Sequence, residues 1–440
     1  MKPLWVFEGK ALKVLTCILS EIKHIYLYFI SKLKEKCNEY YFFLGKRAIM
    51  LAYKKRGVVM KRWLAGILIA LMCFGTGCGS EMAEHAPEEI IKTAEEIRQE
   101  TIENLIDTMT MEEKIGQLFM CDFRNNPNGT GMTVLSEAGE KIIKDYHLGG
   151  VILFAENLDT LEQTKKLTED LQNAAEIPLF IGIDEEGGLV SRLKKSNIPH
   201  ETMLSPGEMT EPAQAEAAGS SIGETLSEMG VNVDFAPVAD VNTNPDNPVI
   251  GIRSYSDDPQ KAGDMVSAFI QGMQGTGVSA TVKHFPGHGD TAADSHKGEV
   301  FVSHDLERLK TVEFVPFARA VDEGVDFVMV GHIKTPNATT DGLPATLSAQ
   351  AVKLLREDLK FNGVAITDAM NMQAITEYYG DGESAVLSVL AGIDIVLMPA
   401  DLDEAYQAVG KAAQDGRISE ERLKESLWRI LGLKYDKGLL

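Results

Sequence analysis

Fourteen consecutive residues in the middle of the chain contain side chains that could catalyse a reaction. This stretch, KHFPGHGDTAADSH at 283–296, contains three His, two Asp and one Lys. Asp294 and His296 are two residues apart, so in an extended loop their side chains point the same way and the carboxylate can orient the imidazole and raise its basicity. Such a pair can donate and accept protons near neutral pH. The alternative is an Asx-type turn with a solvent-exposed histidine.

A second candidate for chemistry is an aspartate that directly follows an apolar run. Asp368 comes after Val-Ala-Ile-Thr at 364–367, so its carboxylate would project from the end of a strand. Beside Arg and Lys side chains it should stay ionised, as a nucleophile that attacks an acetal carbon must. The alternative is an N-cap for the helix that follows.

Five further polar side chains could hydrogen-bond the hydroxyl groups of a sugar. Each alone would more often be a surface charge or a polar group satisfied in the core. Beside a proton-transferring pair and a candidate nucleophile, however, they predict a hydrolase that acts on a carbohydrate. They are Asp184, Arg192, Arg253, Lys283 and His284.

The loop at 283–296 could instead bind a divalent metal. The candidate ligands are His284, His288, Asp290 and Asp294. The loop contains no Cys, however, and the Gly and Pro residues between these side chains exclude the helical geometry that brings ligands at i and i+4 together. We therefore expect no metal here.

Eight short apolar runs alternate with stretches of helical periodicity from about residue 97 onward. Near-continuous apolar runs of this length are typical of parallel strands buried on both faces. Eight such strands close a (β/α)8 barrel. The runs are 116–121, 149–154, 179–183, 231–237, 278–282, 326–330, 363–367 and 393–398, and the helical stretches are 158–175, 213–229, 259–273, 306–321, 349–360, 402–413 and 419–433.

A single α/β barrel of the TIM type, without a second α/β sandwich domain, is therefore predicted for 97–440. A doubly wound open sheet is the alternative, but no Gly-rich dinucleotide-binding loop follows any run. The first strand is ambiguous, because 111–120 could equally be helical. Polar clusters follow the third to seventh runs, and the carboxyl ends of barrel strands form one rim. We expect the active site at that rim.

The charge of the chain argues against nucleic acid as a partner. The 440 residues are 44% hydrophobic and carry a formal net charge of −22, whereas phosphate binding needs concentrated Lys and Arg. The charge is uneven, because the first 59 residues contain 12 Lys and Arg against 4 Asp and Glu. The rest of the chain is correspondingly acidic.

A lipoprotein-type signal peptide is predicted at 60–78. Met60-Lys61-Arg62 precedes an apolar run at 63–74, and small residues lead to Cys78. This order of charged, apolar and small residues is that of an export signal, and a Cys after small residues resembles the lipidated position of bacterial lipoproteins. Residues 79–96 would then form a polar tether to a membrane-anchored, outward-facing body. The alternatives are a plain cleaved signal and a short membrane anchor.

The basic extension at 1–59 precedes this signal. Because an export signal should begin a protein, we expect translation to start at Met60. The alternative is a basic amphipathic segment at a membrane surface. Processing at Cys78 would leave only Cys121 as a second cysteine, so no internal disulfide framework is expected.

The chain resembles the family three glycoside hydrolases, in particular their bacterial β-N-acetylglucosaminidase (β-hexosaminidase) branch. The likeness covers about residues 105–440. It is carried in order by MTMEEKIGQLFM, GGVILF, IDEEGG, FAPVADVN, IGIRSYSDDP, KHFPGHGDTAADSH and ITDAM. It implies a (β/α)8 barrel, a retaining double displacement and no cofactor. One departure is Leu189, where relatives often have Arg, although Arg192 is retained.

The resemblance also implies roles for the candidate residues. Asp368 would be the nucleophile that forms a glycosyl-enzyme, and His296, assisted by Asp294, would be the acid/base. The five sugar-binding candidates fall where the family binds the terminal sugar. Relatives with β-glucosidase activity usually take a Glu acid/base from a second domain. Closure of the loop, permitted by Gly287 and Gly289, would bring His296 over the bond to be broken.

The expected function is that of an exo-acting β-N-acetylglucosaminidase on the outer face of a membrane. It would trim peptidoglycan or other GlcNAc-containing glycans. The enzymatic alternatives are a phosphorylase with the same covalent intermediate, a β-glucosidase or β-xylosidase, and a metal-dependent hydrolase. The non-enzymatic alternative is a lipoprotein that only binds glycans.

Overall fold

The computed structural model of the protein describes residues 92–126 and 128–440. The predicted extension (1–59), the signal peptide (60–78) with Cys78, and most of the tether (79–96) lie outside the described residues. Helix α4 (Ala94–Thr108) begins three residues before the expected start of the barrel at 97. In the part of the chain that is described, no helix combines the length and the apolar character needed to cross a membrane.

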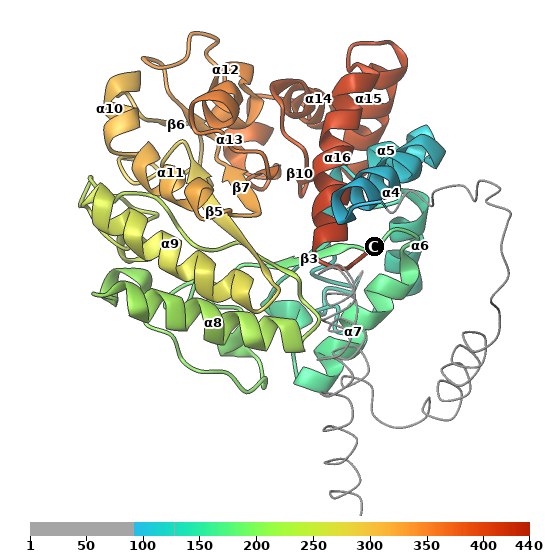
Figure 1. The fold of residues 1–440 in the computed structure, drawn as a ribbon, viewed down its shortest axis with the longest axis horizontal. Coiled ribbons are helices and arrows are strands. Elements are labelled where there is room, and N and C mark those ends of the chain that lie inside the picture. The colour runs from blue at the N-terminus through green and yellow to red at the C-terminus, as the bar shows by residue number, and fades with distance from the viewer. Residues whose placement is uncertain (1–91, 127) are drawn as a thin grey trace, which may run out of the picture. The chain divides into compact units, whose positions relative to one another are not determined.

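Eight parallel strands form a barrel, in the order β10-β1-β2-β3-β4-β5-β7-β9. The ring closes between β9 and β10, where Thr367 N donates to Ile395 O (3.0 Å) and Met370 N to Leu397 O (2.9 Å). The (β/α)8 prediction is therefore confirmed (Figure 1). The strands are β1 (Phe119–Asp122), β2 (Gly150–Leu153), β3 (Phe180–Ile183), β4 (Val233–Asp234), β5 (Ser279–Phe285), β7 (Phe327–Val330), β9 (Val364–Thr367) and β10 (Val396–Leu397).

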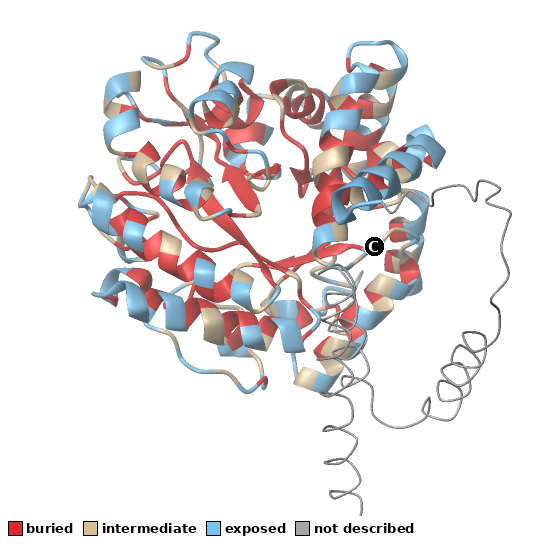
Figure 2. Ribbon diagram, viewed as in Figure 1, coloured by how far each residue is buried: buried red, intermediate tan, exposed pale blue. Residues whose placement is uncertain are grey.

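The strands are short and apolar because both of their faces are covered. Every position of β2, β3, β7 and β9 is buried. A strand buried on both faces needs apolar residues at successive positions, which is why each predicted run overlaps a strand. Figure 2 shows the strands buried, with helices around them that are buried toward the strands and exposed outward.

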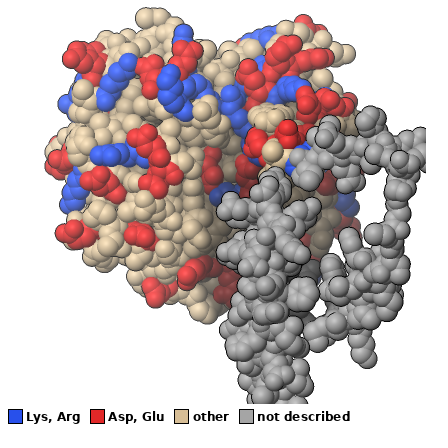
Figure 3. All heavy atoms as spheres, viewed as in Figure 1, with Lys and Arg blue, Asp and Glu red and all other residues tan. Residues whose placement is uncertain are grey.

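The helices form the outer layer, and acidic and basic side chains are interspersed over the face in Figure 3. Several begin with a side-chain cap, as where Ser348 accepts the N–H of Ala351 and Asp401 that of Glu404. Besides α4 they are α5 (Met111–Gly116), α6 (Glu137–Asp145), α7 (Leu161–Ala174), α8 (Pro212–Glu228), α9 (Pro259–Gly275), α10 (Leu306–Thr311), α11 (Phe314–Asp322), α12 (Ala349–Lys353), α13 (Gln373–Thr376), α14 (Asp381–Ala391), α15 (Leu402–Gln414) and α16 (Glu420–Asp436).

The structure differs from the sequence prediction in several elements. Residues 111–116 are helical, and the first strand starts only at Phe119. The helix predicted at 306–321 is divided into α10 and α11, so that Pro316 lies in the first turn of α11, where its missing N–H costs nothing. A two-stranded sheet of β6 (Val300–Phe301) and β8 (Ile333–Lys334) was not predicted.

A buried carboxylate cross-links the elements at the amino-terminal end of the strands. Asp394, fully buried just before β10, accepts hydrogen bonds from Arg356 Nη2 (2.6 Å), Arg429 Nη1 (3.1 Å) and Arg422 Nη2 (3.3 Å). Burial alone would raise the pKa of Asp394, but the three guanidinium groups outweigh it and lower the pKa. Since Arg422 and Arg429 lie on α16, this cluster joins the last helix to the barrel.

We predict that Asp394→Asn lowers the free energy of unfolding by about 3–5 kcal/mol, because it leaves guanidinium groups without their counter-ion. Urea denaturation measures the change. The control is Glu383→Gln, which breaks an exposed pair with Arg417 and should cost less than about 1 kcal/mol. Equal losses in the two variants would contradict the role given to Asp394.

Candidate active site

The candidate residues gather at the carboxyl-terminal ends of the strands. Asp184 directly follows β3, Lys283 and His284 lie in the last part of β5, and Asp368 directly follows β9. In a parallel barrel these ends lie on one rim, which is where (β/α)8 enzymes place their active sites. The structure therefore brings these candidate residues to one rim, as their place after the apolar runs predicted.

A buried lysine is the centre of the predicted sugar-binding group. Lys283 Nζ lies 2.9 Å from Asp184 Oδ1 and 2.7 Å from Glu186 Oε1. Arg192 Nη2 donates to the other oxygen of Asp184 (2.9 Å), and Arg253 donates through Nε and Nη2 to both oxygens of Glu186 (2.8 and 2.7 Å). Four of the five predicted residues thus converge on one charge network.

Glu186 belongs to this network although it was not among the predicted site residues. Burial by itself would raise the pKa of Glu186, but the charges of Lys283 and Arg253 lower it to about 2. The pKa of Asp184 is likewise lowered, against the effect of burial, by Lys283 and Arg192. In the sequence, the motif IDEEGG was the signal that could have identified Glu186. That motif holds three successive acidic residues, however, and does not single out one of them.

The network has a buried part and an accessible part. The side chains of Lys283 and Glu186 are 3% and 1% exposed, whereas those of Arg192 and Asp184 are 28% and 18% exposed. Lys283 and Glu186 therefore support Asp184 and Arg192, which remain able to meet a ligand. Leu189, at the position that departs from the family pattern, is exposed at the same rim.

The fifth predicted residue, His284, is held by a second residue that the sequence analysis did not select. Asp240 Oδ2 lies 2.7 Å from Nδ1 of His284, and Asp240 Oδ1 accepts the backbone N–H groups of His284 (3.2 Å) and His288 (2.6 Å). With Nδ1 engaged, His284 has Nε2 available for a ligand. Asp240 lies after β4 in the motif FAPVADVN.

Asp368 does not cap the helix that follows it, so the alternative of an N-cap role is not realised. Helix α13 begins at Gln373 with Met372 at the N-cap. Desolvation raises the pKa of Asp368, but nearby His332 and His284 and the N–H of Ala369 (2.8 Å) lower it below its ordinary value. Asp368 is therefore ionised near neutral pH.

His332, after β7, supports the segment around Asp368. Its Nε2 donates to Ala369 O (2.9 Å), and its Nδ1 lies 2.8 Å from Thr346 Oγ1. Burial lowers the pKa of His332, and the negative charge of Asp368 opposes this shift. In the sequence, His332 belongs to the polar cluster after the sixth apolar run, and it was not selected as a site residue.

Asp294 and His296 form the predicted pair. Asp294 Oδ1 accepts the backbone N–H of His296 (2.9 Å) and lies 3.0 Å from its Nδ1. The Asx-type turn and the orienting carboxylate, posed as alternatives, are thus both present. Desolvation raises the pKa of Asp294, but its bonds to His296 lower it overall.

The pair lies on the same side of the rim as Asp368. The charge of His296 is among those that lower the pKa of Asp368. Ser295, between the two members of the pair, accepts through its carbonyl oxygen the N–H of Ala374, six residues after Asp368 (3.3 Å). The side chain of His296 is 65% exposed, so its imidazole is open to a substrate.

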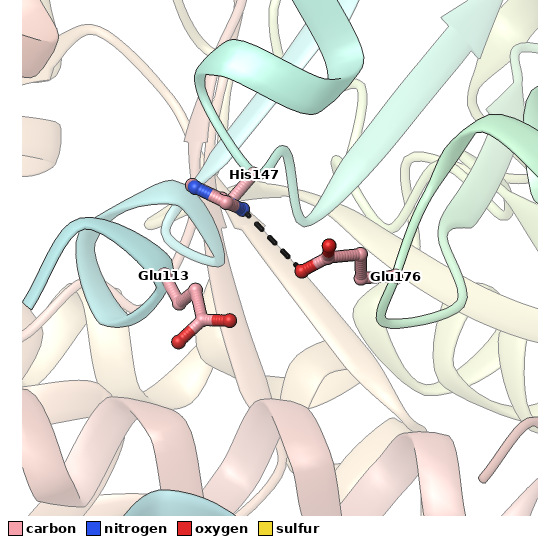
Figure 4. A group of neighbouring side chains, drawn as sticks. All are labelled: Glu113, His147 and Glu176. Atoms are coloured by element: carbon pink, nitrogen blue, oxygen red, sulfur yellow. Dashed lines mark ion pairs between the residues drawn. The ribbon is translucent and has the colours of Figure 1, made fainter. Parts of the chain in front are cut away.

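The residues considered for a metal site in the loop point to separate partners. Both ring nitrogens of His288 bond to hydroxyl groups, and Asp290 bonds to Thr243 Oγ1 (2.8 Å) and His304 Nε2 (2.7 Å). The group of described residues that could hold a cation is instead Glu113, His147 and Glu176, whose ligand atoms lie within 4.8 Å of one another (Figure 4). These residues come before β1, β2 and β3, at the end of the barrel opposite to Asp368.

Comparison with known proteins places this site in a family. Residues 110–433 match the glycosyl hydrolase family 3 N-terminal domain. The chain is 36% identical over 365 residues to beta-hexosaminidase A of Pseudoalteromonas piscicida, an alignment that covers 74% of this chain and 61% of the relative. The chain thus spans less than two thirds of the length of that relative.

Solved structures show the same similarity. A family 3 β-N-acetylglucosaminidase from Paenibacillus sp. strain FPU-7 has a TM-score of 0.71 and 39% identity, over 76% of this chain and 63% of that chain. A β-glucoside phosphorylase, BglX, also has a TM-score of 0.71, with 25% identity over 78% of this chain and 62% of that chain.

We predict that Glu186→Gln lowers the free energy of unfolding by about 3 kcal/mol near pH 7, because Lys283 and Arg253 lose a counter-ion. A carboxyl whose pKa is lower in the folded state stabilises the fold above its unfolded pKa of about 4.3, and this contribution disappears as the pH falls toward 2. The difference between wild type and variant should therefore shrink on acidification.

Urea denaturation at pH 7 and at pH 3 tests this dependence. Glu224→Gln, on an exposed position of α8, is the control and should change stability by less than about 0.5 kcal/mol at either pH. A difference for Glu186→Gln that stays constant with pH would contradict the assignment.

Proposed function

Since the chain belongs to glycosyl hydrolase family 3, we propose that it is a retaining exo-β-N-acetylglucosaminidase. It would hydrolyse terminal β-linked GlcNAc from peptidoglycan or related glycans. The observation that carries the proposal is that Asp368 directly follows β9 at the same rim as the loop of the accessible His296–Asp294 pair, and that Ser295 O accepts the N–H of Ala374 in the segment after Asp368. The relatives named for β-hexosaminidase and β-N-acetylglucosaminidase activity support the choice of sugar.

In the proposed first step, a carboxylate oxygen of Asp368 attacks the anomeric carbon. The bond from that carbon to the glycosidic oxygen breaks, and this oxygen takes a proton from Nε2 of His296. Asp294 holds Nδ1 of the ring, so Nε2 is the nitrogen that faces the substrate, and the carboxylate stabilises the imidazolium form before transfer. The product of this step is a glycosyl ester on Asp368.

In the proposed second step, the now neutral His296 accepts a proton from water as the water attacks the same carbon. The ester bond to Asp368 breaks and the carboxylate leaves. Two inversions give net retention of the anomeric configuration. Asp184, Arg192 and Nε2 of His284 would bind the hydroxyl groups of the terminal sugar, because Asp184 and Arg192 are the more exposed members of the network and the other ring nitrogen of His284 is bound by Asp240.

A phosphorylase is the second candidate function, favoured by the similarity to the β-glucoside phosphorylase BglX. It would form the same ester, but phosphate would replace water in the second step. Because phosphate then ends up on the anomeric carbon, the product is a sugar 1-phosphate.

We also propose that the protein is exported and anchored to the outer face of a membrane through a lipid on Cys78. The order of charged, apolar and small residues at 60–78 supports this. Expression of the full chain in bacteria with a clickable fatty acid should label wild type and Cys73→Ala but not Cys78→Ala. Label retained in Cys78→Ala would end the proposal.

We predict that Asp368→Asn lowers kcat on aryl β-GlcNAc by at least about 1,000-fold, because an amide does not form the ester. Asp401→Asn is the control, since Asp401 caps α15 and Asn caps equally well. It should retain wild-type turnover. A similar kcat in the two variants would refute the nucleophile assignment.

The substrate and the acceptor are tested on the wild-type protein. We expect aryl β-GlcNAc to be preferred over aryl β-glucoside and β-xyloside, and its turnover to be independent of phosphate. Preference for an unacetylated sugar would refute the branch assignment. Acceleration by phosphate with release of a sugar 1-phosphate would favour the phosphorylase.

A further inference from the structure

The loop that carries the acid/base pair has a fixed first half. Asp240 accepts the N–H groups of His284 and His288, and Asn247 Nδ2 donates to the carbonyl oxygens of His288 (2.8 Å), Gly289 (3.2 Å) and Thr291 (3.1 Å). A Cβ at Gly289 would lie 1.9 Å from Val241 O. Gly289 therefore permits close packing of the loop on the segment after β4, in addition to any role in loop closure.

The tip of the loop, at 294–296, makes fewer hydrogen bonds to the rest of the protein, although Ser295 is buried. The carbonyl oxygen of Ser295 accepts the N–H of Ala374 at 3.3 Å, which is a long hydrogen bond. The hydroxyl group of Ser295 lies 3.1 Å from Nε2 of His288. Among the described residues, this second bond is the side-chain link between the fixed half of the loop and its catalytic tip.

His288 is well placed to hold that tip. Its side chain is buried, its backbone N–H is bound by Asp240, and its Nδ1 lies 2.7 Å from Thr291 Oγ1. With both ring nitrogens engaged inside the protein, the ring has no free nitrogen for a substrate or a metal. Any effect of His288 on the loop tip therefore passes through Ser295, the tip residue to which its ring is hydrogen-bonded.

We propose that His288 is a positioning residue that holds the His296–Asp294 pair over the substrate through its hydrogen bond to Ser295. The inference rests on the proposed function, because it assumes that His296 protonates the leaving group. Ser295 lies between the two members of the pair, so a shift of its backbone moves both. A displacement of about 1 Å at a reacting group can cost roughly 100-fold in rate.

Substitutions at His288 can separate its two hydrogen bonds. The amide nitrogen of Gln reaches the position of Nε2 and keeps the bond to Ser295, whereas that of Asn reaches the position of Nδ1 and keeps only the bond to Thr291. Ser295→Ala removes the same bond from the other side. The variants are His288→Gln, His288→Asn, Ser295→Ala and His288→Asn with Ser295→Ala.

The measurement is kcat/KM, which reports formation of the glycosyl-enzyme, on 4-nitrophenyl and phenyl β-GlcNAc. Phenol is the poorer leaving group and depends more on the proton donor. His288→Asn and Ser295→Ala should each lower kcat/KM on the phenyl substrate by roughly 10- to 100-fold, and on the 4-nitrophenyl substrate by less than about threefold. His288→Gln should stay close to wild type, and the double variant should lose no more than either single variant.

Several results would overturn the inference. Equal losses on the two substrates would show general damage, additive losses would show that the two residues act separately, and unchanged kinetics would show that the bond is irrelevant. Asp290→Asn is the control in the same loop, because Asp290 bonds to Thr243 and His304 and not to the tip. It should leave the ratio of the two kcat/KM values unchanged.

The failure of this inference is distinct from failure of the proposed function. If wild type does not hydrolyse aryl β-GlcNAc, the proposed function fails and takes the positioning role with it. If wild type is active, Asp368→Asn is inactive, and His288→Asn behaves as wild type, the positioning role alone fails.

Discussion

The buried carboxylate of Asp240 holds together the parts of the rim on which the candidate site depends. Its two oxygens bind the backbone N–H of His284, the ring of His284 and the backbone N–H of His288. An isolated buried carboxylate is strongly unfavourable. Burial raises the pKa of Asp240, but the neighbouring His284 and these hydrogen bonds lower it overall. Because Asp240 follows β4, it joins the end of that strand both to the end of β5 and to the loop that carries Asp294 and His296.

The second organising feature is a set of charges arranged before any ligand arrives. Lys283 is buried between Asp184 and Glu186, and each carboxylate also binds an arginine. Polar groups already paired in this way need little reorganisation when a substrate binds, which is the property that makes preorganised sites effective. The buried members, Lys283 and Glu186, fix the positions of the more exposed members, Asp184 and Arg192.

The two ends of the barrel carry different kinds of polar groups. At the amino-terminal end, Asp394 binds three arginines, and Lys434 is buried with bonds to Gln117 Oε1 (2.7 Å) and Gly149 O (3.0 Å). Burial lowers the pKa of Lys434 to about 7. These groups join α16 to the strands and are remote from Asp368. The carboxyl-terminal end carries the accessible acid and imidazole groups, in keeping with the division of roles in (β/α)8 proteins.

The sequence by itself determined the eight strands, because a parallel strand covered on both faces must be apolar along its length. It also determined that the candidate residues lie on one rim, since Asp184, Lys283 and Asp368 each directly follow such a run. It did not distinguish Glu186 from Glu185, which are adjacent and chemically alike. Only the tertiary structure decided that Arg253, 67 residues away, binds Glu186, while Glu185 accepts the N–H groups of Arg192 and Leu193. The physical reason is that local sequence sets where a chain is apolar and where it turns, whereas closure of the barrel decides which distant charges meet.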